Sequence, residues 1–230
     1  MGLLCRNDRA ARIKCVCRTE AGNEVNVVYF SVSDLEQGRS VFADGSTQLQ
    51  VLDFKVETVP TFVDYLRAGV TISMVAAIDY TASNGAISHP GSLHTLRGVN
   101  QYKQALYSVG KVLEPYDADK SFPVYGFGGI PRYMGINGVE HCFALSGNPA
   151  APEIFGIEAI VQQYENTLPN IGLSGPTMFS PLLRQFRDYV QALVNTGNMQ
   201  YNTMLLLTDG AIHDMRETID LVCELAVLPA

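Results

Sequence analysis

Three segments near the start of the chain have the hydrophobic pattern of β-strands. They are residues 12–17, 24–30 and 47–56. The third segment alternates apolar and polar residues over most of its length, as a half-buried antiparallel strand does. Gly22-Asn23 and Asp44-Gly45-Ser46 provide turn residues between the segments. A few strands are too little for an independent β-sandwich, so residues 11–57 are interpreted as the last part of a larger β domain.

After Pro60 the pattern changes to nearly continuous apolar runs that alternate with segments of helical periodicity. A continuous apolar run is typical of a strand covered on both faces in a parallel sheet, and a period of about 3.6 residues indicates a helix. The predicted strands are residues 70–79, 122–127, 141–145 and 203–209. The predicted helices are residues 99–113, 152–168, 179–196 and 215–226. This alternation predicts a Rossmann-like, doubly wound α/β fold.

The two patterns divide the chain into two predicted domains. Residues 1–57 form the C-terminal part of a β domain, and residues 58–230 form the α/β domain. The chain ends at Leu228-Pro229-Ala230, where a further parallel strand is expected. Without that strand, Met204–Leu207 would form an exposed apolar sheet edge, which natural proteins avoid. We therefore expect the sequence to be truncated at both ends, with the α/β domain incomplete at its C-terminal end.

The composition indicates a folded protein that does not bind nucleic acid. Hydrophobic residues make up 47% of the 230-residue chain, which is enough for a buried core. There are 16 Lys+Arg against 23 Asp+Glu, a net charge of −7, and no basic run that would follow a phosphate backbone. Nucleic acid is therefore not an expected partner.

Targeting signals and cysteine usage favour a cytoplasmic location. The sequence has no run of about 20 apolar residues and no apolar signal-peptide core at its N-terminus. Its five cysteines are odd in number and scattered, which suits free thiols in a reducing compartment. Gly2 and Cys5 are possible lipid acceptors, but Arg6 stands where the myristoylation pattern has Ser or Thr. An ordinary chain start is the favoured interpretation.

Five oxygen-bearing side chains lie at the ends of predicted buried strands or in an adjoining loop. They are Asp79, Thr81, Ser83, Thr177 and Asp209. In an open α/β sheet, ligands bind beyond the carboxyl ends of the strands, so these side chains are expected to converge. Carboxylates and hydroxyls are the ligands that Mg²⁺, Mn²⁺ and Ca²⁺ prefer, and no His or Cys nearby suggests zinc. Because only two of the five are carboxylates and the rest are neutral hydroxyls, the metal would keep net positive character and an open or water-filled position for an acidic group of a partner.

The same five residues also have a purely structural interpretation. Asp79, Thr81 and Ser83 would form a side-chain-stabilised turn, Thr177 would cap a helix, and Asp209 would form a turn with Gly210. Each feature taken alone would be interpreted in this way. The occurrence of all five together favours the metal site.

Three other features are weaker candidates for chemistry. Gly126–Gly129 lacks the Lys-Ser/Thr of a phosphate-binding loop. Tyr116–Asp119 is acidic, but a solvated turn after a helix is favoured over a second metal site. The histidines, including His94, share no arrangement with a nucleophile and are interpreted as surface or packing residues.

The sequence around the predicted metal ligands resembles the copine family over roughly residues 60–228. The segments that carry this resemblance are Asp79-Tyr80-Thr81-Ala82-Ser83-Asn84-Gly85, Ser92-Leu93-His94, Gly98–Tyr102, Tyr116–Lys120, Phe122–Gly128, Gly175–Pro181 and Thr208-Asp209-Gly210. Residues 129–134 and 146–151 look divergent from the usual family sequence, and partner specificity could differ there.

The resemblance implies a copine-type von Willebrand A domain whose metal-ion-dependent adhesion site consists of the five residues above. It implies that residues 11–57 are the last strands of a C2-like β-sandwich and that Asp64–Gly69 is the joint between the two domains. Copines are calcium-dependent phospholipid-binding proteins, so the full-length protein is expected to be recruited peripherally to the plasma membrane. Because no aspartate cluster precedes residue 60, this chain alone should not bind membranes through calcium.

Two other functions are alternatives to a non-enzymatic copine fragment. The first is the substrate-recruiting A domain of a copine-like RING ubiquitin ligase, although the strand-rich residues 11–57 favour copine. The second is a hydrolase that uses the metal to activate water, but no general base stands beside the predicted site. The protein is therefore expected not to be an enzyme.

Overall fold

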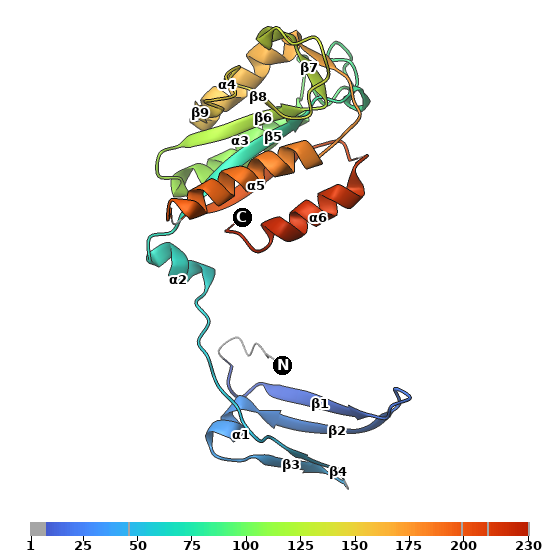
Figure 1. Cartoon of the computed structure of the whole chain (residues 1–230), viewed down its shortest axis with the longest axis vertical. Coiled ribbons are helices and arrows are strands. Elements are labelled where there is room, and N and C mark those ends of the chain that lie inside the picture. The colour runs from blue at the N-terminus through green and yellow to red at the C-terminus, as the bar shows by residue number, and fades with distance from the viewer. Residues whose placement is uncertain (1–7, 46, 199, 211, 230) are drawn as a thin grey trace. The chain divides into compact units, whose positions relative to one another are not determined.

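The computed structural model describes residues 8–45, 47–198, 200–210 and 212–229, and the chain divides into two compact units between Val59 and Pro60 (Figure 1). The lipidation candidates Gly2 and Cys5 lie outside the described residues. Among the helices of the described part, none is long and apolar enough to cross a membrane.

The first unit consists of two antiparallel strand pairs and a short helix. Its elements are β1 (Arg12–Arg18), β2 (Glu24–Ser31), α1 (Val32–Glu36), β3 (Val41–Asp44) and β4 (Thr47–Gln50). β1 pairs with β2, and β3 pairs with β4. Val28, Phe30, Leu35 and Phe42 form a small core, in which the rings of Phe30 and Phe42 stack 4.9 Å apart.

Three features of this unit differ from the sequence prediction, of which the first is that the strand β3, over Val41–Asp44, was not predicted. The strand predicted for residues 47–56 ends at Gln50, where its pairing with β3 ends. The helix α1 was not predicted, although Ser31 and Asp34 form a reciprocal capping box at its start. The hydroxyl of Ser31 accepts from the backbone N–H of Asp34, and the Asp34 carboxylate accepts from the backbone N–H of Ser31.

The second unit is a mixed sheet between two layers of helices. Its sheet has the strand order β11-β5-β6-β8, with β9 also paired to β6. The strands are β5 (Thr71–Asp79), β6 (Ser121–Phe127), β8 (Phe143–Ala144), β9 (Glu153–Phe155) and β11 (Gln200–Leu207). β5 is parallel to both β6 and β11, whereas β8 and β9 are antiparallel to β6.

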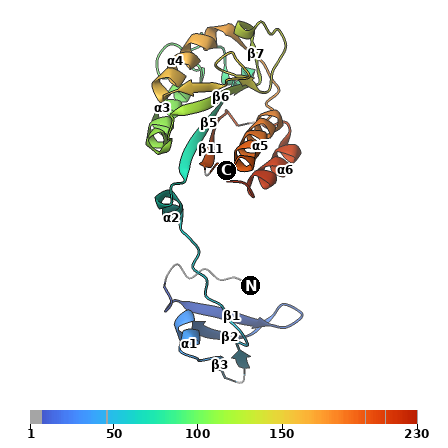
Figure 2. The same ribbon diagram turned by 60° about the vertical axis from the view of Figure 1, so that its left-hand side comes forward.

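Helices cover both faces of this sheet, as the doubly wound prediction requires (Figure 2). The helices are α3 (Gln101–Leu113) and α4 (Ile157–Thr167) on one side, and α5 (Ser180–Asn195) and α6 (Met215–Leu225) on the other. Successive residues of β5 supply both cores, since Ile78 packs with α3 and α4 while Ala77 packs with α5 and α6. This explains why the sequence of β5 is nearly continuously apolar.

The boundaries of several elements correct the prediction. The helix predicted from residue 152 begins only at Ile157, because Glu153–Phe155 pair with β6 and Gly156 has a positive φ of 78°. Three short elements were not predicted. They are α2 (Phe62–Arg67), β7 (Gly129–Pro131) and β10 (Ile171–Leu173), the last two paired with each other.

The strand β11 is the outermost strand on its side of the sheet. Its residues Met204–Leu207 are half-buried, and the backbone N–H of Asn202 donates a 2.8 Å hydrogen bond to the carbonyl oxygen of Pro229. The C-terminal residues that the structure describes therefore return to β11.

Candidate metal centre

Asp79 is a buried carboxylate among a group of hydroxyls at the carboxyl end of β5. Its side chain is fully buried. The Thr81 backbone N–H and hydroxyl both donate to Oδ1 of Asp79, over 2.8 Å and 2.6 Å. The Thr81 and Ser83 hydroxyl oxygens are 2.9 Å apart. The structure therefore brings the first three predicted ligands together within one loop.

Asp209 reaches the same place from β11, the neighbouring parallel strand. Leu207 pairs with Ile78, so the two strands end side by side. The hydroxyl of Thr208, next to Asp209, donates a 2.8 Å hydrogen bond to Oδ2 of Asp79. Oδ1 of Asp209 is buried and has no hydrogen-bond partner among the described residues. A buried carboxylate oxygen without a protein partner is available to a bound cation or water.

Thr177 lies in a loop that runs beside the Asp79 loop. The backbone N–H of Ala82 donates to the carbonyl oxygen of Ser174, and the backbone N–H of Ser174 donates to the carbonyl oxygen of Tyr80. Thr177 is buried and its backbone bonds to His213, in the loop that follows β11. No hydrogen bond of the described chain joins the Thr177 side chain to the other four predicted ligands. The structure therefore brings the Thr177 loop to the site without showing a ligand contact.

Gly128 allows these loops to approach each other. It has a positive φ of 72°, and a Cβ atom at this position would lie 2.4 Å from Cγ2 of Thr81 and 3.7 Å from the carbonyl oxygen of Pro176. A side chain here would therefore collide with Thr81 in the Asp79 loop, whereas the Pro176 oxygen in the Thr177 loop would lie at an ordinary contact distance.

The donor set fits a hard divalent cation. None of the ion pairs of the described chain includes Asp79 or Asp209, so no basic side chain balances their charge. The described residues also contain no cluster of three His, Cys, Asp or Glu side chains, which argues against a zinc-type site there. Two carboxylates with neighbouring hydroxyls suit Mg²⁺ or Mn²⁺, with Ca²⁺ as a further candidate.

Sequence reasoning missed Asn84, which is part of the same cluster. Its side-chain nitrogen donates to Oδ1 of Asp79 over 3.3 Å and to the carbonyl oxygen of Thr81 over 3.1 Å. Its side-chain oxygen accepts from the hydroxyl of Tyr102 on α3 over 2.5 Å. Burial raises the pKa of that Tyr102 hydroxyl, which keeps it a donor. The only sequence signal was the position of Asn84 directly after the Asp-x-Thr-x-Ser pattern.

His94 is also closer to the site than its interpretation as a surface or packing residue suggested. It is fully buried, and its Nε2 lies 2.7 Å from the backbone carbonyl oxygen of Asp79. Burial lowers the pKa of His94 to about 4, so the ring is neutral at physiological pH. His94 is therefore a packing residue and not a surface residue, and its contact with Asp79 was not predicted from the sequence.

The two other sequence candidates prove to be structural. Ring atoms of Phe143 would lie 2.4 Å from a Cβ at Gly126, so that glycine serves packing within the sheet. Asp117 accepts from the backbone N–H groups of Asp119 and Lys120, which makes the expected turn. The expectation that this turn is solvated is wrong for Asp117, which is only 7% exposed.

The sheet and its two helical layers define a mixed α/β domain, which is consistent with the expected von Willebrand A type. The family model described as Copine matches residues 92–230. The chain belongs to the copine family.

Two plant proteins illustrate the relationship. Protein BONZAI 1 of Arabidopsis thaliana is 37% identical over an alignment of 222 residues, and the match covers 89% of this chain and 38% of that protein. Protein BONZAI 2 of the same plant is 36% identical over 186 residues, covering 80% of this chain and 31% of that protein. Residues 60–230 are 171 of the 230 residues, or 74%, so both matches extend into the first unit. The chain spans about a third of the length of these relatives.

Proposed function

We propose that the second unit binds a divalent cation at a metal-ion-dependent adhesion site and, through that cation, an acidic segment of a partner protein. The ligands would be Asp79, Thr81, Ser83, Thr177 and Asp209. The observation that supports this most directly is the buried, unpartnered Oδ1 of Asp209 beside the hydroxyl-lined carboxylate of Asp79.

The charges of the site favour binding of a ligand carboxylate over catalysis. Two carboxylates neutralise a divalent cation only formally, and neutral hydroxyls complete the protein's share of the ligands. An acidic side chain of a partner would then complete the coordination. Ser83 is exposed, so the site is open to solvent at that point. On this basis the unit is a non-enzymatic binding module.

The family suggests the wider role. We interpret the first unit as the C-terminal part of a C2-like domain, and the full-length protein as a calcium-dependent phospholipid-binding protein. The family's upstream domains would then contact the cytoplasmic side of the plasma membrane. Nucleic acid would not be a binding partner. The second unit would recruit the partner protein.

Metal binding can be tested by thermal unfolding of the full chain in EDTA and in MgCl₂, MnCl₂ or CaCl₂. A cation at about 100 times its Kd would stabilise the folded state by about 2.7 kcal/mol. Asp79→Asn keeps the shape of the side chain but removes its charge, and should abolish the shift. Asp220→Ala removes an exposed carboxylate from α6 and should leave the shift unchanged. Absence of any metal-dependent shift, or an equal shift in Asp79→Asn, would refute the proposal.

Partner recognition needs a separate measurement. A short peptide with a single Asp should bind the Mn²⁺-loaded chain, and EDTA should release it. The peptide with Asn in place of that Asp is the matched control and should not bind. Equal binding of both peptides would show that the metal does not receive a carboxylate.

A further inference from the structure

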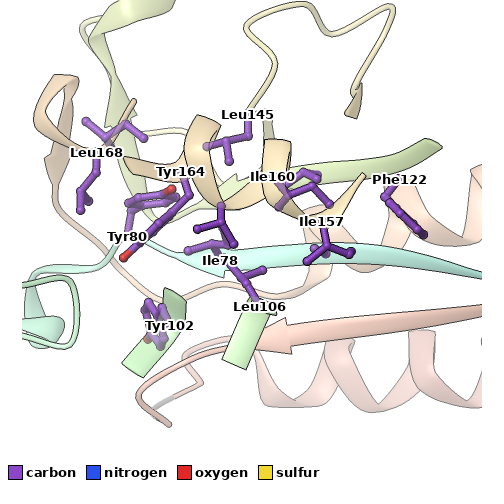
Figure 3. Packing of buried hydrophobic residues seen from close by; sticks show 14 of the residues in the cluster. Ile78, Tyr80, Tyr102, Leu106, Phe122, Leu145, Ile157, Ile160, Tyr164 and Leu168 are labelled. Carbon is purple, nitrogen blue, oxygen red and sulfur yellow. The ribbon is translucent and has the colours of Figure 1, made fainter. Parts of the chain in front are cut away.

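His94 connects the backbone of Asp79 to the side chain of Tyr164 through hydrogen-bond contacts of its two ring nitrogens. Nε2 of the ring is 2.7 Å from the carbonyl oxygen of Asp79, and Nδ1 is 2.8 Å from the Tyr164 hydroxyl on α4. The ring also stacks on Tyr80, with centroids 5.1 Å apart and an interplanar angle of 3°. Figure 3 shows Tyr80 and Tyr164 at the same end of the core cluster. The ring is therefore held by two polar contacts and by packing.

The partners of the ring determine where its proton lies. A carbonyl oxygen can only accept, so Nε2 must carry the hydrogen and donate it to Asp79. Nδ1 then accepts the hydrogen of the Tyr164 hydroxyl. The Tyr164 oxygen accepts in turn from Nδ2 of Asn100, over 3.0 Å. One neutral tautomer satisfies the whole chain of hydrogen bonds.

This chain of hydrogen bonds is anchored at the start of α3. Asn100 caps that helix, because its side-chain oxygen accepts from the backbone N–H of Lys103 over 2.8 Å. Its side-chain nitrogen also donates to the carbonyl oxygen of Thr95, close to His94 in sequence. The hydrogen bonds thus run from α3 through Asn100, Tyr164 and His94 to the end of β5.

The bond to Asp79 lies where the chain leaves the sheet. Pairing of β5 with β11 ends at Ile78 and pairing with β6 ends at Asp79, and the N–H of Tyr80, in the same peptide as the Asp79 carbonyl, donates to the carbonyl oxygen of Phe127. Without His94 the buried carbonyl of Asp79 would lose this partner, and a rotation of that peptide toward another partner would also strain the bond from the Tyr80 N–H to Phe127. Such a rotation would turn the Asp79 carboxylate and the Thr81 loop together.

We propose that His94 is a positioning residue of the metal centre, which orients Asp79 through its backbone carbonyl and is itself oriented by Tyr164. This role rests on the proposed function, because it concerns the same metal. Residues that orient metal ligands typically change metal affinity 10- to 100-fold when substituted.

The test compares two substitutions of His94 by titration of the full chain with MnCl₂. His94→Phe keeps a ring against Tyr80 but cannot donate to Asp79, and should weaken Mn²⁺ binding at least about 10-fold. His94→Gln can place its amide nitrogen near the position of Nε2, and should restore affinity to within about 3-fold of the unmodified chain. Tyr133→Phe is the matched control, since it removes a 2.9 Å hydroxyl–carbonyl hydrogen bond to Ala144 and should not change affinity.

Tyr164→Phe provides a second route that leaves His94 in place. It removes the hydroxyl that holds Nδ1, and should weaken Mn²⁺ binding by a smaller factor than His94→Phe does. If His94→Phe does not fold, a loss of affinity in Tyr164→Phe with none in Tyr133→Phe still supports the role. Unchanged affinity in Tyr164→Phe, or equal losses in His94→Phe and His94→Gln, would overturn it. If the unmodified chain binds no metal, the proposed function fails first and the positioning role fails with it.

Discussion

The hydroxyl of Thr208 donates a 2.8 Å hydrogen bond to Oδ2 of Asp79, across 129 positions of sequence. It joins the ends of two adjacent parallel strands, β11 and β5. The other carboxylate oxygen of Asp79 accepts from Thr81. Both oxygens of this buried carboxylate are thus satisfied by hydroxyls, which are also suitable neighbours for a metal ion.

Thr208→Val should destabilise the metal-free chain by about 1–3 kcal/mol, because a buried carboxylate loses a donor. Valine keeps the branched shape, so the loss of packing is small. Thr203→Val is the matched control, on the strand β11 that leads to Thr208, and the described residues show no hydrogen bond to its hydroxyl. Urea unfolding in EDTA measures both variants. Equal changes in the two would mean that the bond to Asp79 contributes nothing.

Gly128→Ala should destabilise the chain and displace Thr81 at the proposed metal centre. Alanine at this position meets Cγ2 of Thr81 and also requires a positive φ, which costs about 1–2 kcal/mol by itself. Gly135→Ala is the control for that cost, because Gly135 has a φ of 75° and no atom within 4 Å of a Cβ. The excess loss at Gly128 should be about 1–3 kcal/mol in urea unfolding. Equal losses of unfolding free energy in the two variants would show that Thr81 moves aside without an energetic cost.

Asp214 should make stability depend on pH in the acid range. Its carboxylate accepts from the backbone N–H groups of Phe179 and Ser180 at the start of α5. Burial alone would raise the pKa of Asp214, but the hydrogen bonds with Ser180 and Phe179 outweigh it and lower that pKa. The stabilisation is therefore complete above the unfolded-state pKa of about 3.9 and is lost as the pH falls through the lower folded-state pKa.

Asp214→Ala should accordingly cost about 1 kcal/mol at pH 7, and the cost should shrink as the pH falls below about 4. Urea unfolding of both proteins at pH 7 and at about pH 2.5 measures the difference. Asp220→Ala, on the exposed side of α6, controls for the general effect of losing a negative charge. A cost that stays constant over this range would contradict the assigned hydrogen bonds.

Local sequence patterns predicted much of the second unit. The apolar run over β5 predicted a strand buried on both faces. This prediction is confirmed, because alternate residues of β5 belong to the cores on the two faces of the sheet. The predicted helix over residues 179–196 is α5, with Pro181 in the first turn. Where the prediction failed, at β9 and at residues 51–56, the outcome depended on whether a partner strand was present.

The types of the main elements, and the oxygen-bearing side chains at the carboxyl ends of β5 and β11, could be predicted from the sequence. Burial and backbone preferences act over a few neighbouring residues, so they leave a pattern that can be read locally. The tertiary structure alone decided that Thr208 bonds to Asp79 and that His94 and Asn84 belong to the site. Those contacts depend on strand order and on side-chain directions between distant residues, which no local pattern records.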